Sequence, residues 1–363
     1  MAEIYKSFMG DDIVAGDTQI ISQPVWSENM NPYSQSFGGS SGIGFFTSSA
    51  QVSQSGDYYV NTYHRDPADP NESAQAAIQF AIAYGNRVGS GSYGDPNTVG
   101  QNENDTPTRA IYSQYRNQLL PPTDTAFSFN DGAGGTDNPD DIIVFNIARA
   151  RFRQKIDPGN WELRIASGGA GTPNDGATSY MSFVDNSGEE ETPTLNEAGR
   201  VVGIYSGSGA VTASSVQYGL FYPDHGVFVF NATRLANETG MPLNTASPSV
   251  LSVAGTQPKN SVTASLYVSA SSYFAARSEE RVTSTHYFVR VTNKNFNFSN
   301  NPTFVTGSTG NFRFASMLRN PSVYITTIGM YDDNNRLVAV AKLSKPLLKS
   351  FNREALIKVK LDY

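Results

Sequence analysis

The C-terminal third of the chain carries the clearest alternation of apolar and polar residues. Residues 357–363 place Ile, Val, Leu and Tyr at every second position, with Lys, Lys and Asp between them, which predicts a half-buried strand. Residues 324–331 and 336–343 flank the sequence Asp-Asp-Asn-Asn, whose residue types tolerate left-handed backbone. These two runs are therefore predicted to form a β-hairpin. Residues 286–291 form a further predicted strand.

Short strands are also predicted along the middle of the chain. Residues 142–147 are rich in Ile, Val and Phe, as in a buried strand, whereas residues 161–165 alternate and are expected to keep one face in water. Further strands, separated by Gly- and Ser-rich turns, are predicted at 56–63, 180–185, 200–206, 216–222 and 227–231.

Two segments are predicted to be helical. Capping residue types at 71–73 precede a run to residue 84 in which Ala and Ile recur with a spacing near 3.6. The second helix begins at Thr106-Pro107 and runs to about Leu119. A glycine-rich loop is predicted at 85–105, and the polar stretch 235–259 is predicted to be an excursion or a linker.

Residues 1–50 combine scattered aromatic residues with Pro, Gly and Ser. This composition predicts an extended arm with aromatic anchors, and two placements remain open. The arm either becomes ordered on a neighbouring subunit or wraps around its own domain. The residues chosen as interface anchors are Tyr5, Phe8, Trp26 and Phe37.

The predicted elements describe a mainly β protein with a minor helical part, built on antiparallel sheets with a sandwich-like core. Four parts are expected. They are an extended arm at 1–50, a mixed strand and helix segment at 51–125, a β-rich domain at 126–260, and a C-terminal β-rich portion at 261–363 that packs with the 51–260 region.

Composition narrows the possible functions. The 363 residues contain no Cys, so disulfides, thiolate metal sites and Cys nucleophiles are excluded. A formal net charge of −7 lacks the basic excess of a nucleic-acid-binding protein. No run of about 18 apolar residues is present, and the first residues lack a secretory-signal pattern, so we expect synthesis in a cytoplasm without membrane insertion.

One short segment departs from this acidic balance. Arg149, Arg151, Arg153 and Lys155 recur at every second position, so strand geometry would place all four on one face. Such a stripe favours contact with an acidic protein, or a solvated face, over binding of nucleic acid. We therefore include these four residues among the interface candidates.

No segment carries a recognisable catalytic, cofactor or metal signature. His64, His225 and His286 lie far apart in the sequence, and surface or packing roles are predicted for them. The glycine-rich fragments match neither a nucleophile elbow nor a phosphate-binding loop. The acidic runs at 137–141, 189–191 and 332–335 lack the ligand spacing of a calcium loop and are interpreted as solvated turns.

A resemblance is carried by residues 4–8 with 11–13, residues 106–115, the Asn-Phe-Asn-Phe-Ser-Asn-Asn-Pro run at 295–302, the predicted hairpin with its extension to 346, and the closing residues 358–363. These segments resemble structural proteins from the tails and baseplates of large contractile-tailed bacteriophages, of the cyanophage-like myovirus kind. The glycine-rich loops are not covered. The resemblance implies a virion structural role in the tail or baseplate.

Three functions are compared on this basis. The first is a non-enzymatic assembly subunit that acts through subunit packing and strand addition, with other tail or baseplate proteins or further copies of itself as partners and no cofactor. The second is a receptor- or glycan-binding tail protein. The third, which the sequence favours least, is a glycan-degrading tail enzyme, because no pair of carboxylates is singled out.

Overall fold

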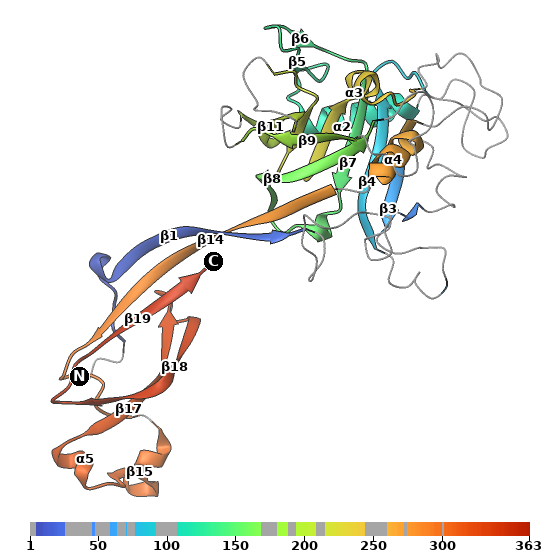
Figure 1. Ribbon diagram of the computed structural model, residues 1–363. Helices are drawn as coiled ribbons and strands as arrows, with labels where there is room; N and C mark the ends of the chain where they lie inside the picture. Colours follow the sequence, from blue (N-terminus) through green and yellow to red (C-terminus); the bar gives the residue numbers. More distant parts are fainter. Residues whose placement is uncertain are drawn as a thin grey trace. The chain divides into compact units, whose positions relative to one another are not determined.

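The computed structural model describes residues 5–25, 46–47, 59–63, 70, 77–91, 107–167, 180–187, 194–207, 215–243, 260–271, 274–299 and 301–363 (Figure 1). The chain divides into two compact units. Unit 1 contains residues 1–20 and 281–363, and unit 2 contains residues 21–280. The boundary falls inside two strands, so it differs from the four-part division expected from composition. Two long strands continue through this boundary, so the amino-acid composition does not change there.

Unit 2 is built on one large antiparallel sheet. The strand order is β14-β8-β9-β11-β12-β13-β7-β4-β3-β2, with β10 beside β11. The strands are β2 (Phe46–Thr47), β3 (Tyr59–Tyr63), β4 (Ile78–Asn86), β7 (Asp141–Ile147), β8 (Lys155–Ala166), β9 (Tyr180–Asp185), β10 (Thr194–Asn196), β11 (Gly199–Ser206), β12 (Gly219–Tyr222), β13 (Val227–Asn231) and β14 (Phe274–Val291). A separate small pair is formed by β5 (Phe129–Asn130) and β6 (Thr136–Asp137). The predicted mainly β fold is confirmed.

Both faces of this sheet are buried. Along β7, Phe145 contributes to one apolar cluster and Val144 to a second, and the neighbouring β13 alternates in the same way. Helices α3 (Ala232–Thr239) and α4 (Asn260–Ser271) add side chains to the first cluster, whereas α2 (Pro107–Leu119) adds side chains to the second. Burial on both faces explains why β7 has a nearly continuous apolar sequence.

The helix predicted to run to residue 84 is wrong for the described part of that segment, which forms strand β4. Its large residues Phe80, Ile82 and Tyr84 alternate toward the first apolar cluster. Small residues occupy the other face, and a Cβ at Gly85 would lie 2.9 Å from the backbone nitrogen of Tyr112 in α2. The spacing of these small residues had suggested a helix. In the structure they allow α2 to approach the sheet closely.

The other helices were predicted unevenly. The α2 helix is confirmed and ends before the proline pair, as expected. Helices α3 and α4 were missed. Asn231 caps the start of α3, because its side chain accepts a hydrogen bond from the Arg234 backbone nitrogen, and Gly240 follows the last turn in the left-handed region. The α3 helix is short and follows directly after β13, so the sequence pattern did not distinguish it from the preceding strand.

Unit 1 contains the second half of β14, which pairs with β19 (Ala355–Asp362), and most of β1 (Ile13–Pro24). The predicted hairpin is confirmed as β17 (Ser322–Tyr331) and β18 (Leu337–Ser350). Short elements complete the unit, namely β15 (Val305–Thr306), β16 (Asn311–Phe312), α5 (Ser316–Arg319) and the 3-10 turns at Gly10–Asp12, Pro302–Phe304 and Gly307–Thr309.

Candidate functional site

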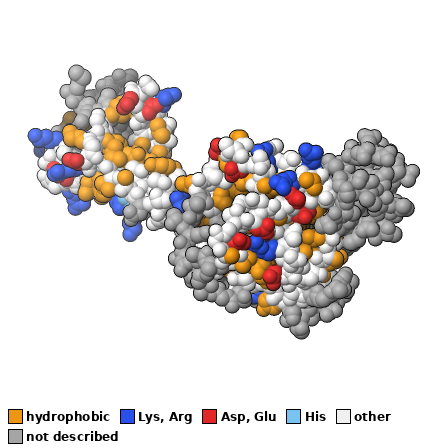
Figure 2. All heavy atoms as spheres, turned by 90° about the horizontal axis from the view of Figure 1, so that it is seen from above, with side chains coloured by type: hydrophobic (Ala, Val, Ile, Leu, Met, Phe, Trp, Pro, Cys, Tyr) orange, Lys and Arg blue, Asp and Glu red, His pale blue; other side chains and the backbone are white. Residues whose placement is uncertain are grey.

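Exposed apolar side chains are concentrated in unit 1. Among the described residues, 26 large apolar side chains are exposed, and 18 of them belong to unit 1 although unit 2 is the larger unit. Figure 2 shows hydrophobic side chains gathered among Lys and Arg on unit 1, at the left of the view. Exposed apolar area of this density is typical of a surface that binds another molecule.

The outer face of the β17–β18 hairpin forms a continuous part of this surface. The pairs Gly329–Val340 and Tyr331–Leu337 lie on the same side of the hairpin. A Cβ at Gly329 would lie 3.0 Å from the Tyr331 ring and 3.1 Å from Leu337, so both side chains cover the glycine. The Tyr5 ring lies 5.3 Å from that of Tyr331. We call Tyr5, Tyr331, Leu337 and Val340 the hairpin patch; each is 47–59% exposed.

The core beneath the hairpin is small. Its cluster contains three buried residues, whereas the larger cluster of unit 2 contains 28. The members are Val291, Ala355 and Ile357, with Val289, Phe296, Ile325, Ile328 and Leu343 packed against them. Unit 1 therefore gains little stabilisation from its own apolar burial, and a partner that covered its surface would add more.

A buried lysine fixes one loop against the hairpin. The Lys349 side chain is fully buried, and its Nζ donates to the Asn293 carbonyl at 3.1 Å, the Asn297 Oδ1 at 2.7 Å and the Ser350 carbonyl at 3.2 Å. These three bonds use all three ammonium hydrogens. Burial lowers the pKa of Lys349. This lysine therefore holds the loop after β14 in place.

The predicted aromatic anchors are only partly described. Tyr5 belongs to the hairpin patch, and the half-buried Phe8 lies 5.3 Å from the Tyr287 ring. Trp26 and Phe37 lie outside the described residues. The other members of the patch were missed, because the hairpin sequence predicts strands and gives no sign of which face remains exposed. In the described part of the arm, β1 pairs with the chain's own β14 and β2 pairs with β3.

The basic run does not form the predicted strand stripe. Arg149 and Arg151 lie in a 3-10 turn, and β8 begins only at Lys155. The reason is local: Phe152 turns inward to the core and carries the Arg149 guanidinium 4.7 Å above its ring. Acidic neighbours for Arg153 and Lys155 are found in the chain itself, as described next.

Two ion pairs join this run to β14. Lys155 Nζ lies 2.9 Å from Glu279 Oε1, and both side chains are buried, with 8% and 5% exposure. Arg153 pairs at 2.6 Å with Glu280, and this pair is more exposed. The buried pair fixes the register of β14 against β8, where Glu279 lies opposite Lys155.

The end of β1 is attached beside these pairs. Arg277 donates to the Ser22 side chain at 2.8 Å and to its carbonyl at 3.1 Å. Ser22 in turn donates to Asp157 at 3.3 Å, and Asn160 donates to the same carboxylate at 2.7 Å. Burial raises the pKa of Asp157, and nearby Glu279 adds to the shift. These contacts hold strands in place and involve no exposed nucleophile.

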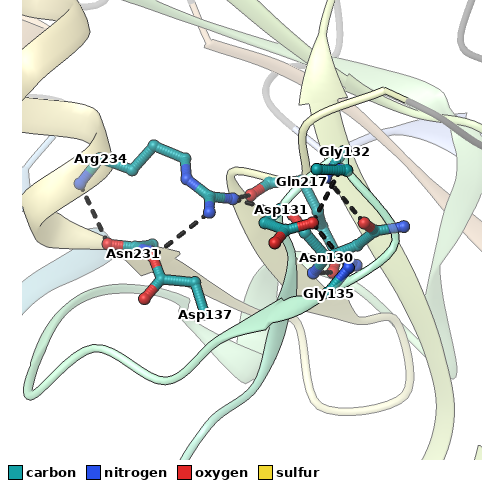
Figure 3. A network of polar contacts seen from close by, with 9 residues as sticks. Asn130, Asp131, Gly132, Gly135, Asp137, Gln217, Asn231 and Arg234 are labelled. Atoms are coloured by element: carbon teal, nitrogen blue, oxygen red, sulfur yellow. Dashed lines mark hydrogen bonds and ion pairs between the residues drawn. The ribbon is translucent and has the colours of Figure 1, made fainter.

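Figure 3 shows a second polar network, formed around Arg234 at the β5–β6 loop. Arg234 donates to the carbonyls of Asn130, at 3.0 Å, and Gln217, and it pairs with Asp137 at 3.2 Å. Asp131 accepts hydrogen bonds from two backbone nitrogens of its own loop, which lower its pKa. All of these acceptors are engaged by the protein, which indicates a role in shaping the loop.

A buried tyrosine and carboxylate form the third network. The Tyr84 hydroxyl donates to Asp141, and the Asn86 side chain donates to the same oxygen at 2.6 Å. Asn86 also accepts from the backbone nitrogens of Val88, Gly89 and Ser90, which closes the turn after β4. Desolvation strongly raises the pKa of Tyr84, so the phenol stays protonated and acts as a donor.

Two of the three histidines belong to the described residues. His225 lies in the turn before β13 and His286 lies within β14, while His64 falls outside the described residues. In the part of the chain that the structure describes, no group of three or more His, Asp or Glu is arranged to hold a metal ion. No helix among these residues is long and apolar enough to cross a membrane.

Comparisons with protein-family models, curated proteins and solved structures found no match to this chain.

Proposed function

We propose that the chain is a structural assembly subunit that binds neighbouring subunits through unit 1. The observation that carries this proposal is the dense exposed apolar surface on a unit with a small core. Covering such a surface stabilises an assembly and the unit itself. The sequence resemblance adds the location, which we propose to be the tail or baseplate of a contractile-tailed bacteriophage.

Strand addition is a second means of contact in this proposal. Among the described strands, β1 lies at one end of the strand order, so one of its edges presents backbone N–H and C=O groups to which another strand can pair. Four of its apolar side chains, Ile13, Val14, Ile20 and Ile21, are 42–60% exposed. A neighbouring strand added at this edge would also cover these side chains.

The location is tested by mass spectrometry of purified virus particles separated into heads and tails. The proposal expects peptides of this chain in the tail fraction, and their absence from both fractions would refute the location.

The contact surface is tested by complementation with the Leu337→Ser variant. We expect this variant to enter particles poorly. A matched control is Leu195→Ser, which changes a leucine that is 83% exposed in unit 2. Equal incorporation of the two variants would contradict the use of unit 1 as the contact surface.

A further inference from the structure

Strand β17 has an open edge. Strands β17 and β18 form a sheet of their own, and no other described strand pairs with either of them. Among the described residues, no backbone hydrogen bond joins β17 to a segment outside the hairpin. The N–H and C=O groups along the outer edge of β17 can therefore pair with a further strand.

The two outer edges of the hairpin differ in composition. Strand β18 carries Lys342, Lys345 and Pro346, and its register against β17 skips residues 343–346. Lysine, proline and bulges are the means by which edge strands avoid unwanted pairing. The ten residues of β17 contain no charge and no proline, and five of them are Val, Ile or Thr. The β17 edge therefore has the composition of a strand that pairs.

The two faces of β17 would meet different side chains of an added strand. Ile325 and Ile328 pack against the small core of unit 1 and are only half-buried, so apolar residues of the added strand would extend that core. The opposite face carries Tyr324 and Tyr331, which are 65% and 47% exposed, with Lys342 on the paired strand. Polar residues of the added strand would lie on this second face, close to a cation.

Cations occur around this edge. Arg319 is the last residue of α5 and precedes β17 by three positions, and Lys6 follows Tyr5, whose ring contacts Tyr331 at the other end of the strand. Both cations are exposed. No Asp or Glu occurs between Arg281 and Tyr331. The edge therefore lies in a positive environment.

The described part of unit 1 is basic as a whole. Residues 281–363, of which all but residue 300 are described, contain 12 Lys and Arg against 4 Asp and Glu, and residues 5–20 add one Lys and three Asp. Three of the four C-terminal acids already contact a cation of the chain, namely Asp332, Glu354 and Asp362. A second copy that paired through its own β17 would bring like charge to the edge, whereas an acidic partner is attracted.

We propose that β17 binds an extended acidic segment of a partner protein as an added strand. The inference rests on the proposed assembly function and names the chemistry of the partner, in which acidic residues alternate with apolar ones that face the small core. Backbone hydrogen bonds supply the affinity of such a contact, and the charges select the partner.

Two labelled peptides of ten residues, the length of β17, test this proposal on the full-length chain. Glu alternates with Val in the first peptide, and Lys alternates with Val in the second. We expect fluorescence anisotropy to show binding of the Glu peptide alone, and an increase in salt from about 50 to about 500 mM to weaken it about tenfold. Equal binding of the two peptides, or no binding of the Glu peptide, would overturn the proposal.

Charge reversals locate the binding site. Lys342→Glu and Arg319→Glu each place a like charge near the added strand, whereas Arg109→Glu makes the same change at an exposed cation on α2. We expect the first two variants to raise the dissociation constant of the Glu peptide about tenfold and Arg109→Glu to change it less than about twofold. Circular dichroism spectra and melting temperatures verify folding. Equal effects of all three reversals would show that total charge attracts the peptide, which contradicts the proposal.

Hydrogen–deuterium exchange distinguishes an added strand from loose attachment. Saturating Glu peptide is expected to slow exchange in residues 322–331 and to leave residues 337–350 unchanged, because only the outer edge of β17 gains hydrogen bonds. Unchanged exchange in residues 322–331 would refute strand addition. Protection of this segment in concentrated free chain, together with dimer formation, would make a second copy the occupant and also refute the proposal. Tighter binding of a short DNA duplex than of the Glu peptide at this edge would do the same.

Failure of this inference can be told apart from failure of the proposed function. If the peptide results exclude an acidic strand while Leu337→Ser still enters particles poorly, unit 1 keeps its assembly role with a partner of different chemistry. If Leu337→Ser enters particles as well as Leu195→Ser does, the proposed contact surface fails whatever the peptides show.

Discussion

The buried pair of Lys155 and Glu279 gives a quantitative test of how β14 is held in unit 2. Replacing Lys155 with Met keeps most of the side-chain volume but leaves the Glu279 carboxylate buried without its cation. Both side chains are at most 8% exposed and their charged atoms are 2.9 Å apart, so solvent can compensate little. Breaking such a pair from one side costs about 3–5 kcal/mol of unfolding free energy.

The measurement is urea unfolding followed by tryptophan fluorescence, to which Trp161, buried on β8, contributes. The double variant Lys155→Met with Glu279→Leu removes both charges, and we expect it to recover most of the stability lost in the single variant. A loss below about 1 kcal/mol in the single variant, or a double variant as unstable as the sum of the two single variants, would show that this ion pair does not hold β14 in place.

Three further predictions concern other parts of the chain. Lys349→Met removes three hydrogen bonds from a charged donor, so we expect a loss of about 2 kcal/mol and faster amide exchange near Asn297. Gly219→Ala places a Cβ 2.5 Å from the Val229 carbonyl, and we expect a loss of about 1–3 kcal/mol in urea unfolding, whereas Gly10→Ala meets no atom within 4 Å and should be neutral. Burial raises the pKa of Asp157 in the folded protein, so ionisation of this carboxyl opposes folding at pH 7. Asp157→Asn should therefore raise the melting temperature at pH 7. The difference from wild type should vanish below about pH 4, where the carboxyl is protonated in both the folded and the unfolded chain.

The sequence predicted the elements whose side chains alternate against one buried face. Strand β19 is an example, because Ala355, Ile357 and Val359 are buried while the residues between them are exposed. The hairpin was predictable from its turn residues, although its sequence could not show that Leu337 and Val340 remain exposed. Exposure depends on which other elements cover a strand, and the strand's own sequence does not contain that information.

The failures have the same physical origin. Strand β4 lies between β3 and β7 with both faces buried, so apolar and polar residues do not alternate along it. The small residues that face α2 recur at a spacing close to that of a helix. The basic run was misinterpreted because Phe152 turns inward and interrupts the strand before Lys155. The basic excess of residues 281–363, with 12 basic and 4 acidic residues, was hidden because the rest of the chain is acidic and brings the overall formal net charge to −7.

Hydrogen–deuterium exchange of the free chain and of the chain in purified particles tests the assembly claim most directly. We expect residues 322–350 to exchange more slowly in particles, because the exposed face of the hairpin becomes covered. Unchanged exchange in this segment, with slower exchange confined to unit 2, would contradict the claim that unit 1 provides the assembly surface.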